Sequence, residues 1–419
     1  MNVCVVGSGA REHALALACA RTADVVVTPG NPGIQGRSPE GHTLESRAAP
    51  PEEIEADLYV IGPEAPLVAG LADRLRGLGG LVFGPGADGA RLEGSKAYMK
   101  ELAAAAGVPT ARFAVFERPD DALAHLRAAA GPYVIKTDGL AAGKGVLVTS
   151  DLAAAEADVV AKLSGEAFGA AGRRVVIEEA LVGREASLLA VCDGERALAL
   201  PVARDYKRAL DGDLGPNTGG MGACSPVTFV EDKTVDEAMD RIVLPTLREL
   251  RRRGIDYKGV LYAGLMLGDD GPRLVEFNVR FGDPETEVVL PRMAGDCTGL
   301  LAAAAGGRVP DGVACAPAAA VCVVAAAAGY PANPRHGDVI GGLDAAGAVE
   351  GVTVLHAGTR RDADGTLRTD GGRVLAVTAV APTIGAARQR AYEAIGAVEI
   401  EGVQYRGDIA EPEEVRSTP

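Results

Sequence analysis

Runs of consecutive apolar residues alternate with helical patterns over the first part of the chain. Residues 2–6 form a continuous apolar run that ends at Gly7, which is typical of a buried parallel strand. Further strand patterns lie at 25–27, 58–61 and 81–83, with helical patterns at 14–21 and 68–78. This β-α-β alternation predicts an N-terminal doubly wound domain.

The pattern changes beyond a predicted helix at 95–106. Residues 113–181 read as strand, helix, strand, glycine-rich hairpin, helix and strand, which predicts a compact α+β unit able to move as one body. Longer strands are predicted within 186–282, with a long loop at 204–226 and a helix at 233–253. The C-terminal part returns to short strands and a helix, at 319–324, 352–357, 374–380 and 384–396.

Composition and charge exclude several classes of protein. The 419 residues are 47% hydrophobic and 24% charged, as in a folded globular protein, and allow two to four domains. A net charge of −15 argues against nucleic acid as a partner but permits a small phosphorylated ligand. Seven cysteines without a Cys-x-x-Cys motif argue against a disulfide scaffold and a structural zinc site. The start of the chain lacks the basic region of a signal peptide, and the longest apolar run, 314–328, contains Pro317. We therefore expect a cytoplasmic protein that does not enter membranes.

Residues 7–13 read Gly-Ser-Gly-Ala-Arg-Glu-His between the first predicted strand and helix. Such a loop places backbone N–H groups where anions bind, and Arg11 and His13 favour a phosphate site over a purely structural turn. A dinucleotide fingerprint would need glycine at position 12, which argues against a nicotinamide cofactor. Glu64 follows another predicted strand, at the edge where ligands of parallel sheets gather.

Lys136 ends a predicted strand and is followed by a loop rich in glycine, 139–145. This arrangement is suited to phosphate but is not a Walker A loop, because Gly145 stands where Ser or Thr would bind magnesium. The loop is either a cover over a nucleotide or a plain hairpin with solvated lysines. A second extended segment, 175–185, carries glutamates that suit ribose hydroxyls and backbone groups that can read adenine.

Glu276, Asn278 and Arg280 alternate along a predicted strand and therefore share one face, while Val275, Phe277 and Val279 share the other. A carboxylate and an amide oxygen two residues apart suit a hard divalent cation. The arginine can hold a carboxylate or phosphoryl group with two hydrogen bonds. The glycine-dense loop 215–222 either closes over a ligand or is a mobile surface loop.

Five segments in this order resemble the glycinamide ribonucleotide synthetase family of the ATP-grasp superfamily over essentially the whole chain. They read Gly-Ser-Gly-Ala-Arg-Glu-His-Ala, Gly-Pro-Glu-Ala-Pro-Leu, Asp-Gly-Leu-Ala-Ala-Gly-Lys-Gly, Gly-Pro-Asn-Thr-Gly-Gly-Met-Gly-Ala and Glu-Phe-Asn-Val-Arg-Phe-Gly-Asp-Pro-Glu. Arg204, where the family commonly has Gln, and Cys224, in place of an aromatic residue, depart from the pattern.

The resemblance implies an α/β ATP-grasp fold in four parts. These are an N-terminal doubly wound domain at 1–94, a central domain at 95–112 plus 182–316, a mobile lid subdomain at 113–181 and a small α+β domain at 317–419. It also implies that ATP, glycine and 5-phosphoribosylamine give glycinamide ribonucleotide through a glycyl phosphate, with Mg²⁺ or Mn²⁺, in a protein that is a monomer.

The resemblance further implies a role for each site residue. Arg280 would act in catalysis, and Glu276 and Asn278 would hold the metal. ATP would be bound by Lys96, Lys136, Gly139, Gly143, Lys144, Gly145, Glu178, Ala180, Leu181 and Glu185. The other substrates would be bound by Gly9, Arg11, Glu12, His13, Glu64, Asp205, Lys207, Asn217, Thr218, Gly219, Gly220, Met221, Asp283 and Glu285. The alternatives are another carboxylate–amine ligase of the superfamily, a nucleotide-linked dehydrogenase, or a nucleotide-binding module without activity.

Overall fold

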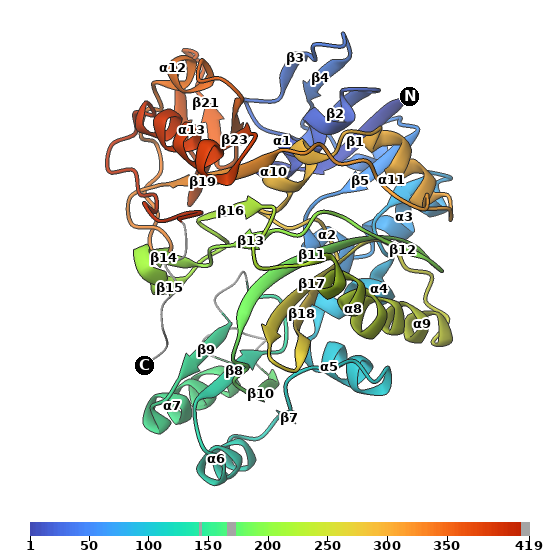
Figure 1. Ribbon diagram of the computed structural model, residues 1–419, viewed down its shortest axis with the longest axis vertical. Helices are drawn as coiled ribbons and strands as arrows, with labels where there is room; N and C mark the ends of the chain where they lie inside the picture. Colours follow the sequence, from blue (N-terminus) through green and yellow to red (C-terminus); the bar gives the residue numbers. More distant parts are fainter. Residues whose placement is uncertain (142–144, 166–172, 412–419) are drawn as a thin grey trace.

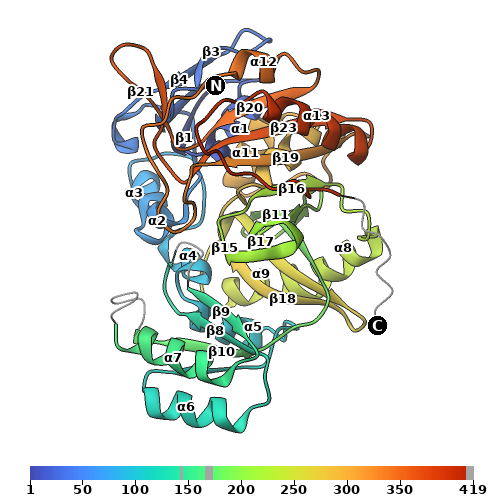
Figure 2. The same cartoon turned by 90° about the vertical axis from the view of Figure 1, so that its left-hand side faces the viewer.

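The computed structural model describes residues 1–141, 145–165 and 173–411. The N-terminal and C-terminal sheets lie side by side at one end of the molecule, and the sheet formed by residues 113–179 lies at the other (Figure 1, Figure 2). A further sheet, β12-β11-β17-β18 (within residues 184–199 and 258–278), lies between them. Within the described residues, no helix has the length and apolar character needed to cross a membrane.

The N-terminal sheet is doubly wound, as predicted, with the order β3-β4-β2-β1-β5-β6. Its strands are β1 (Asn2–Gly7), β2 (Asp24–Pro29), β3 (Gln35–Arg37), β4 (Thr43–Ser46), β5 (Leu58–Ile61) and β6 (Val82–Phe83). The pairs that β1 makes with β2 and β5 are parallel. The apolar residues of β1 are buried, which is why this strand reads as a continuous apolar run.

The helices of this part depart from the prediction in three places. Helix α1 (Ala10–Cys19) begins four residues earlier than expected. The predicted helix at 68–78 is two helices, α2 (Glu64–Val68) and α3 (Leu71–Gly77), separated at Gly70, whose φ of 78° is left-handed. Helix α4 (Ala87–Gly94) precedes α5 (Lys96–Ala105) and is not among the predicted helices.

Residues 113–179 form an antiparallel sheet, β7-β10-β8-β9, with two helices and its own apolar core. The elements follow the predicted order: β7 (Phe113–Phe116), α6 (Pro119–Ala128), β8 (Tyr133–Thr137), β9 (Val146–Thr149), α7 (Leu152–Leu163) and β10 (Val175–Glu179). We call this part the lid sheet below.

The central sheet has the order β12-β11-β17-β18 and packs on both faces. Its strands are β11 (Arg184–Asp193), β12 (Ala197–Ala199), β17 (Lys258–Gly268) and β18 (Gly271–Asn278). One face packs against α5 and α9 (Leu244–Arg252), and the other joins the core of the N-terminal sheet. Helix α8 (Asp232–Ala238) continues into α9 through a π-helical turn at Met239–Val243, close to the single predicted helix at 233–253.

The C-terminal sheet has the order β13-β16-β19-β23-β20 and therefore includes two strands from the segment predicted as a long loop. The strands of the sheet are β13 (Arg204–Asp205), β16 (Gly222–Ser225), β19 (Ala319–Ala326), β20 (Val352–His356) and β23 (Arg373–Ala381). Two hairpins accompany it, β14 (Arg208–Leu210) with β15 (Leu214–Asn217), and β21 (Thr359–Arg361) with β22 (Leu367–Thr369). The helices of this region are α10 (Thr286–Val289), α11 (Cys297–Ala305), α12 (Leu343–Gly347) and α13 (Ile384–Gly396).

Candidate active site

A cavity of about 1120 Å³ lies where the lid sheet, the central sheet and the two terminal sheets meet. Nineteen of the predicted site residues line it, namely Arg11, Glu64, Lys96, Lys136, Gly145, Glu178, Ala180, Leu181, Glu185, Asp205, Lys207, Asn217, Thr218, Gly219, Glu276, Asn278, Arg280, Asp283 and Glu285. Six described ones do not: Gly9, Glu12, His13, Gly139, Gly220 and Met221. Gly143 and Lys144 lie outside the described residues.

At the lid end of the cavity, Glu178 lies between two buried lysines. Its Oε1 atom is 3.1 Å from Nζ of Lys136, and its Oε2 atom is 2.9 Å from Nζ of Lys100. Lys136 also donates a hydrogen bond to the carbonyl of Val275, at 3.2 Å. Glu178 and Lys136 are predicted site residues, whereas Lys100 is not, because a helix position gives no signal of a partner on a distant strand.

Asp138 connects the glycine-rich segment to the first turn of α5. Its Oδ1 atom accepts hydrogen bonds from the backbone N–H of Ala97 at 2.7 Å and from the hydroxyl of Ser95 at 2.9 Å. The carboxylate also pairs with Arg174 at 2.6 Å. Lys96, the first residue of α5, is thereby placed beside the glycine-rich segment, and its Nζ lies 3.9 Å from Oε2 of Glu276.

Glu276 and Asn278 both face the cavity, as the alternation predicts, and Phe277 and Val279 face the core. The prediction for Val275 is wrong. The pairing of β17 with β18 shifts between Gly264 and Leu265, so that Val275 is an extra residue in the strand and lines the cavity. Burial raises the pKa of Glu276, but the positive charges of Lys96 and Lys136 outweigh this and hold the pKa at about 2.

The Glu276 carboxylate and the Asn278 amide oxygen are suited to a divalent cation. Among the described residues the Glu276 side chain makes no hydrogen bond, and its one ion pair is the 3.9 Å contact with Lys96. Over the same part of the chain there is no group of three or more His, Cys, Asp or Glu side chains arranged to hold a metal. Two protein oxygens fit magnesium, which commonly takes one or two protein ligands and completes its shell with phosphates and water.

Two carboxylates orient Arg280. Its Nη2 atom lies 3.0 Å from Oε1 of Glu93, and its Nε atom lies 3.3 Å from Oε2 of Glu64. Burial lowers the pKa of Arg280, but these carboxylates raise it further, so the net shift is upward. Glu93 lies at the end of α4 and was not predicted as a site residue. Nothing in the sequence around it indicates a contact with Arg280.

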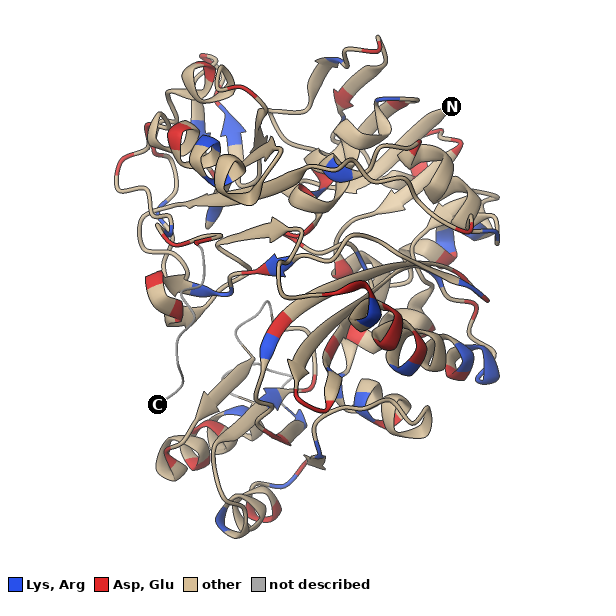
Figure 3. Cartoon of the chain, viewed as in Figure 1, with Lys and Arg blue, Asp and Glu red and all other residues tan. Residues whose placement is uncertain are grey.

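A cluster of acidic residues lines the cavity around Lys207. The lysine Nζ is 2.6 Å from Oε2 of Glu185 and 3.8 Å from Oδ1 of Asp205. Oε1 of Glu285 accepts hydrogen bonds from the Tyr262 hydroxyl at 2.8 Å and the Ser187 hydroxyl at 3.0 Å. Burial raises the pKa of Asp205 to about 7, with Lys207 opposing the shift and Glu285 adding to it. Figure 3 shows residues of opposite charge side by side at the start of β11 and along β13.

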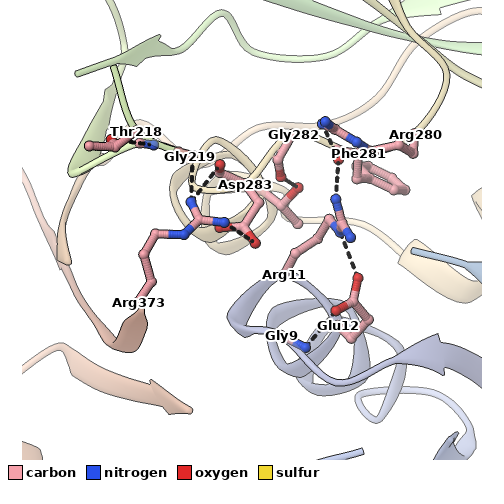
Figure 4. Close-up of polar contacts among 12 residues, drawn as sticks. Gly9, Arg11, Glu12, Thr218, Gly219, Arg280, Phe281, Gly282, Asp283 and Arg373 are labelled. Atoms are coloured by element: carbon pink, nitrogen blue, oxygen red, sulfur yellow. Dashed lines mark hydrogen bonds and ion pairs between the residues drawn. The ribbon is translucent and has the colours of Figure 1, made fainter. Parts of the chain in front are cut away.

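Residues 9–13 make contacts among themselves and with the C-terminal sheet. Glu12 accepts a hydrogen bond from the backbone N–H of Gly9 at 2.7 Å and pairs with Nε of Arg11 at 2.6 Å, so it caps its own helix (Figure 4). His13 is buried, and its Nδ1 accepts a hydrogen bond from the backbone of His356 at 3.0 Å. Burial and His356 lower the pKa of His13 to about 3, which makes it neutral. Of these residues, Arg11 alone reaches the cavity.

Arg373, from the C-terminal sheet, joins two predicted segments of the site. It donates hydrogen bonds to the carbonyls of Gly219 at 2.5 Å and Asp283 at 3.0 Å, and its Nη2 pairs with Oδ2 of Asp283 at 3.0 Å (Figure 4). Gly220 has a φ of 110°, and a Cβ there would lie 2.4 Å from Pro284, so the two segments pack closely. The loop 215–222 is therefore part of the cavity wall.

Comparison with known proteins covers nearly the whole chain. Three models of phosphoribosylglycinamide synthetase match it: the N domain at residues 1–93, the ATP-grasp (A) domain at 94–286 and the C domain at 320–412. Among curated proteins, the phosphoribosylamine–glycine ligase of Streptomyces coelicolor is 49% identical, covering 98% of this chain and 99% of that protein. That of Caulobacter vibrioides is 47% identical, covering 98% and 97%.

Solved structures give the same result. The crystal structure of phosphoribosylamine–glycine ligase from Thermotoga maritima matches with a TM-score of 0.85 and 37% identity, covering 98% of this chain and 100% of that one. N5-carboxyaminoimidazole ribonucleotide synthetase from Thermotoga maritima matches with a TM-score of 0.62 at 16% identity, covering 95% and 99%, which is a likeness of fold alone.

Proposed function

The chain belongs to the phosphoribosylglycinamide synthetase family, and from that membership we propose how its cavity carries out the family's reaction. The protein is an ATP-dependent ligase of purine biosynthesis that joins glycine to 5-phosphoribosylamine, giving glycinamide ribonucleotide, ADP and phosphate. A carboxylate is a poor electrophile, so a glycine carboxylate oxygen first attacks the γ-phosphorus of ATP and ADP leaves. The amine nitrogen of phosphoribosylamine then attacks the carbonyl carbon of glycyl phosphate, and phosphate leaves.

ATP occupies the lid end of the cavity in this proposal. Lys96 and Lys136 bind its phosphates, and the described part of the glycine-rich segment, which includes Gly145, covers them. Adenine and ribose lie along Glu178, Ala180, Leu181 and Glu185 at the end of β10 and the start of β11. The burial of the Lys136 ammonium supports this, because a charge in a cavity wall acts on phosphates with little screening by water. The lid sheet closes over the nucleotide and excludes water from the acyl phosphate.

The divalent metal ion is Mg²⁺ or Mn²⁺, held by Glu276 and Asn278 together with phosphate oxygens. When bound, the ion neutralises charge that develops on the transferred phosphoryl group. The low pKa of Glu276 supports this assignment, because the carboxylate stays charged and available as a ligand.

Glycine binds between Arg280 and the acidic cluster. The Arg280 guanidinium holds the glycine carboxylate, and later the acyl phosphate, with a geometry fixed by Glu64 and Glu93. Asp205 and Glu285 accept the glycine ammonium, which needs acceptors of negative charge close to the carboxylate site. Lys207 holds Asp205 in place until the substrate enters.

Phosphoribosylamine enters from the side formed by the terminal sheets. Arg11, Asn217, Thr218, Gly219 and Asp283 line that side, and Arg11 supplies positive charge for the ribose phosphate. Behind the residues that line this side, and outside the cavity itself, lie Gly9, Glu12, His13, Gly220 and Met221. We further propose that the protein works as a monomer in the cytoplasm, without nucleic acid or membrane partners.

The convergence of Glu276, Asn278 and Arg280 with Lys96 and Lys136 in one cavity carries this proposal. The test is the release of ADP from ATP with glycine, measured with and without phosphoribosylamine. We expect multiple turnovers only when both are present, with glycinamide ribonucleotide formed in equal amount to ADP. Release of ADP in the absence of glycine, at an unchanged rate, would exclude glycine as the phosphoryl acceptor.

A further inference from the structure

A lysine outside the cavity completes the ion-pair cluster at its lid end. Lys100 lies one helical turn after Lys96 on α5, and its side chain is 0% exposed. Its contact with the cavity is through Glu178, whose second oxygen contacts Lys136. Lys136 and Glu178 line the cavity, whereas Lys100 does not.

The charges of this cluster explain why a second lysine is needed. One carboxylate paired with Lys136 alone would leave a neutral pair, with little attraction for phosphate. Because Glu178 is shared with Lys100, the cluster of three keeps one net positive charge, and Lys136 faces the cavity with that charge. A buried carboxylate with one partner removed would also be costly and would be expected to move.

The same cluster is attached to the strand that carries Glu276. Lys100 donates a hydrogen bond to the Thr110 hydroxyl at 2.8 Å, which donates to the carbonyl of Leu274 at 2.7 Å. Lys136 donates to the next carbonyl, that of Val275. Both contacts fall at the irregular pair of residues directly before Glu276, so the cluster fixes the phosphate lysine and the metal carboxylate relative to each other.

We propose that Lys100 is a positioning residue for ATP, which shares Glu178 with Lys136 so that the cluster keeps a net positive charge toward the phosphates and Lys136 stays aligned with Glu276. This inference rests on the proposed binding of ATP phosphates by Lys136. Lys100 touches neither substrate nor metal in this scheme, so its removal should affect nucleotide affinity first.

The primary test is the dissociation constant of a non-hydrolysable ATP analogue, measured by calorimetry with Lys100→Met and Lys100→Arg. We expect Lys100→Met to weaken binding by about tenfold or more and Lys100→Arg to weaken it less, with the KM for glycine within about twofold of the wild type. The matched control is Lys162→Met. Like Lys100, Lys162 is a buried lysine in an ion pair, here with Asp158, but it lies in helix α7 of the lid sheet. This control should lose thermal stability and keep its nucleotide affinity. Unchanged affinity in folded Lys100→Met would overturn the proposal.

The route through Glu178 has its own test. In a Glu178→Gln background the carboxylate that neutralises Lys136 is gone, so adding Lys100→Met should change nucleotide affinity by less than about twofold. Equal effects of Lys100→Met in both backgrounds would show that Lys100 does not act through Glu178.

The variant Lys136→Met distinguishes a failure of the proposed role of Lys100 from a failure of the proposed phosphate binding by Lys136. If Lys136→Met binds the analogue normally, the phosphate assignment itself fails. If it binds weakly while Lys100→Met binds normally, only the role of Lys100 fails.

A measurement on the unmodified protein remains informative if Lys100→Met does not fold. The charged groups that face Lys100 are Glu178 from β10, Lys136 from β8 and Glu276 from β18. Burial lowers the pKa of Lys100 to about 8, with Lys136 adding to the shift and the two carboxylates opposing it. The cluster therefore loses its net charge as the pH rises through this value, and affinity for the analogue should fall between about pH 7 and pH 9. Constant affinity over that range would contradict the proposal.

Discussion

Arg11 and Arg280 donate hydrogen bonds to the same acceptor, the carbonyl of Phe281, at 3.3 and 3.2 Å. Arg11 lies in helix α1 and Arg280 follows strand β18, so this carbonyl fixes the distance between the two proposed anion sites of the cavity (Figure 4). The glycine carboxylate at Arg280 and the ribose phosphate at Arg11 would then be bound on a rigid base.

Arg280→Lys should impair glycine binding although it keeps the charge. A lysine cannot make two parallel hydrogen bonds to a carboxylate, nor can it pair with both Glu64 and Glu93. We expect the KM for glycine to rise by about tenfold or more, with the KM for ATP nearly unchanged. Steady-state kinetics with each substrate varied in turn checks this. A normal glycine KM with a raised ATP KM would assign Arg280 to the nucleotide.

Glu276→Gln should lower turnover by about a hundredfold or more, because it removes the one charged oxygen ligand proposed for the metal. The loss should be partly reversed by a high concentration of Mg²⁺ or Mn²⁺, since binding weakens before chemistry is altered. The measurement is kcat as a function of metal concentration. Turnover close to normal at low metal would be incompatible with this assignment.

Affinity for glycine should depend on pH through Asp205. Its pKa is raised to about 7, so this carboxyl is neutral below that pH and charged above it. The ammonium group of glycine needs the charged form, so kcat/KM for glycine should rise as the pH rises from about 6 to 8. Asp205→Asn should lower the value and remove the rise. ATP is kept saturating, so that titration of the nucleotide end does not contribute.

Glu12→Ala should reduce stability more than catalysis. Glu12 caps α1 through the N–H of Gly9 and pairs with Arg11, in a buried position. We expect the free energy of unfolding to fall by about 1–2 kcal/mol, measured with denaturant, and the KM for glycine to stay near normal. A large kinetic defect in a protein of normal stability would instead support the original prediction that Glu12 binds substrate.

Nucleotide should protect the tip of the lid sheet from hydrogen exchange. Phosphates bound by Lys136 would order the glycine-rich segment and offset the entropy that ordering costs. We expect the amides of residues 139–141 and 145–149 to exchange more slowly with a non-hydrolysable ATP analogue than without it. Exchange that is the same in both states would contradict a closing lid.

The sequence predicted best those elements whose pattern is local. β5 and α13 have the predicted bounds, because a short apolar run and a helical pattern between Thr383 and Ala397 each leave one interpretation. Helix α4 was missed because its residues, with two glycines among eight, show little helical preference and are held by packing instead. The strands β13 and β16 were missed for a related reason, since β13 pairs with β16 and β16 pairs with β19 across about a hundred residues.

The sequence predicts those site residues whose type and local spacing indicate their chemistry. Glu276, Asn278 and Arg280 alternate visibly along one strand, whereas the irregularity at Val275 depends on pairing with β17. Glu93, Lys100 and Arg373 act through partners far away in the chain, at Arg280, Glu178 and Asp283. No spacing within the sequence encodes such pairs.

The pairing of β16 with β19 limits how this protein can be divided. Residues 222–225 pair with 320–323, so the C-terminal sheet is assembled from two stretches that lie on either side of β17 and β18 in the chain. A truncation near residue 316 would leave β16 as an open edge prone to aggregation. A chimera that exchanges the C-terminal part between relatives would therefore have to exchange residues 204–225 with it.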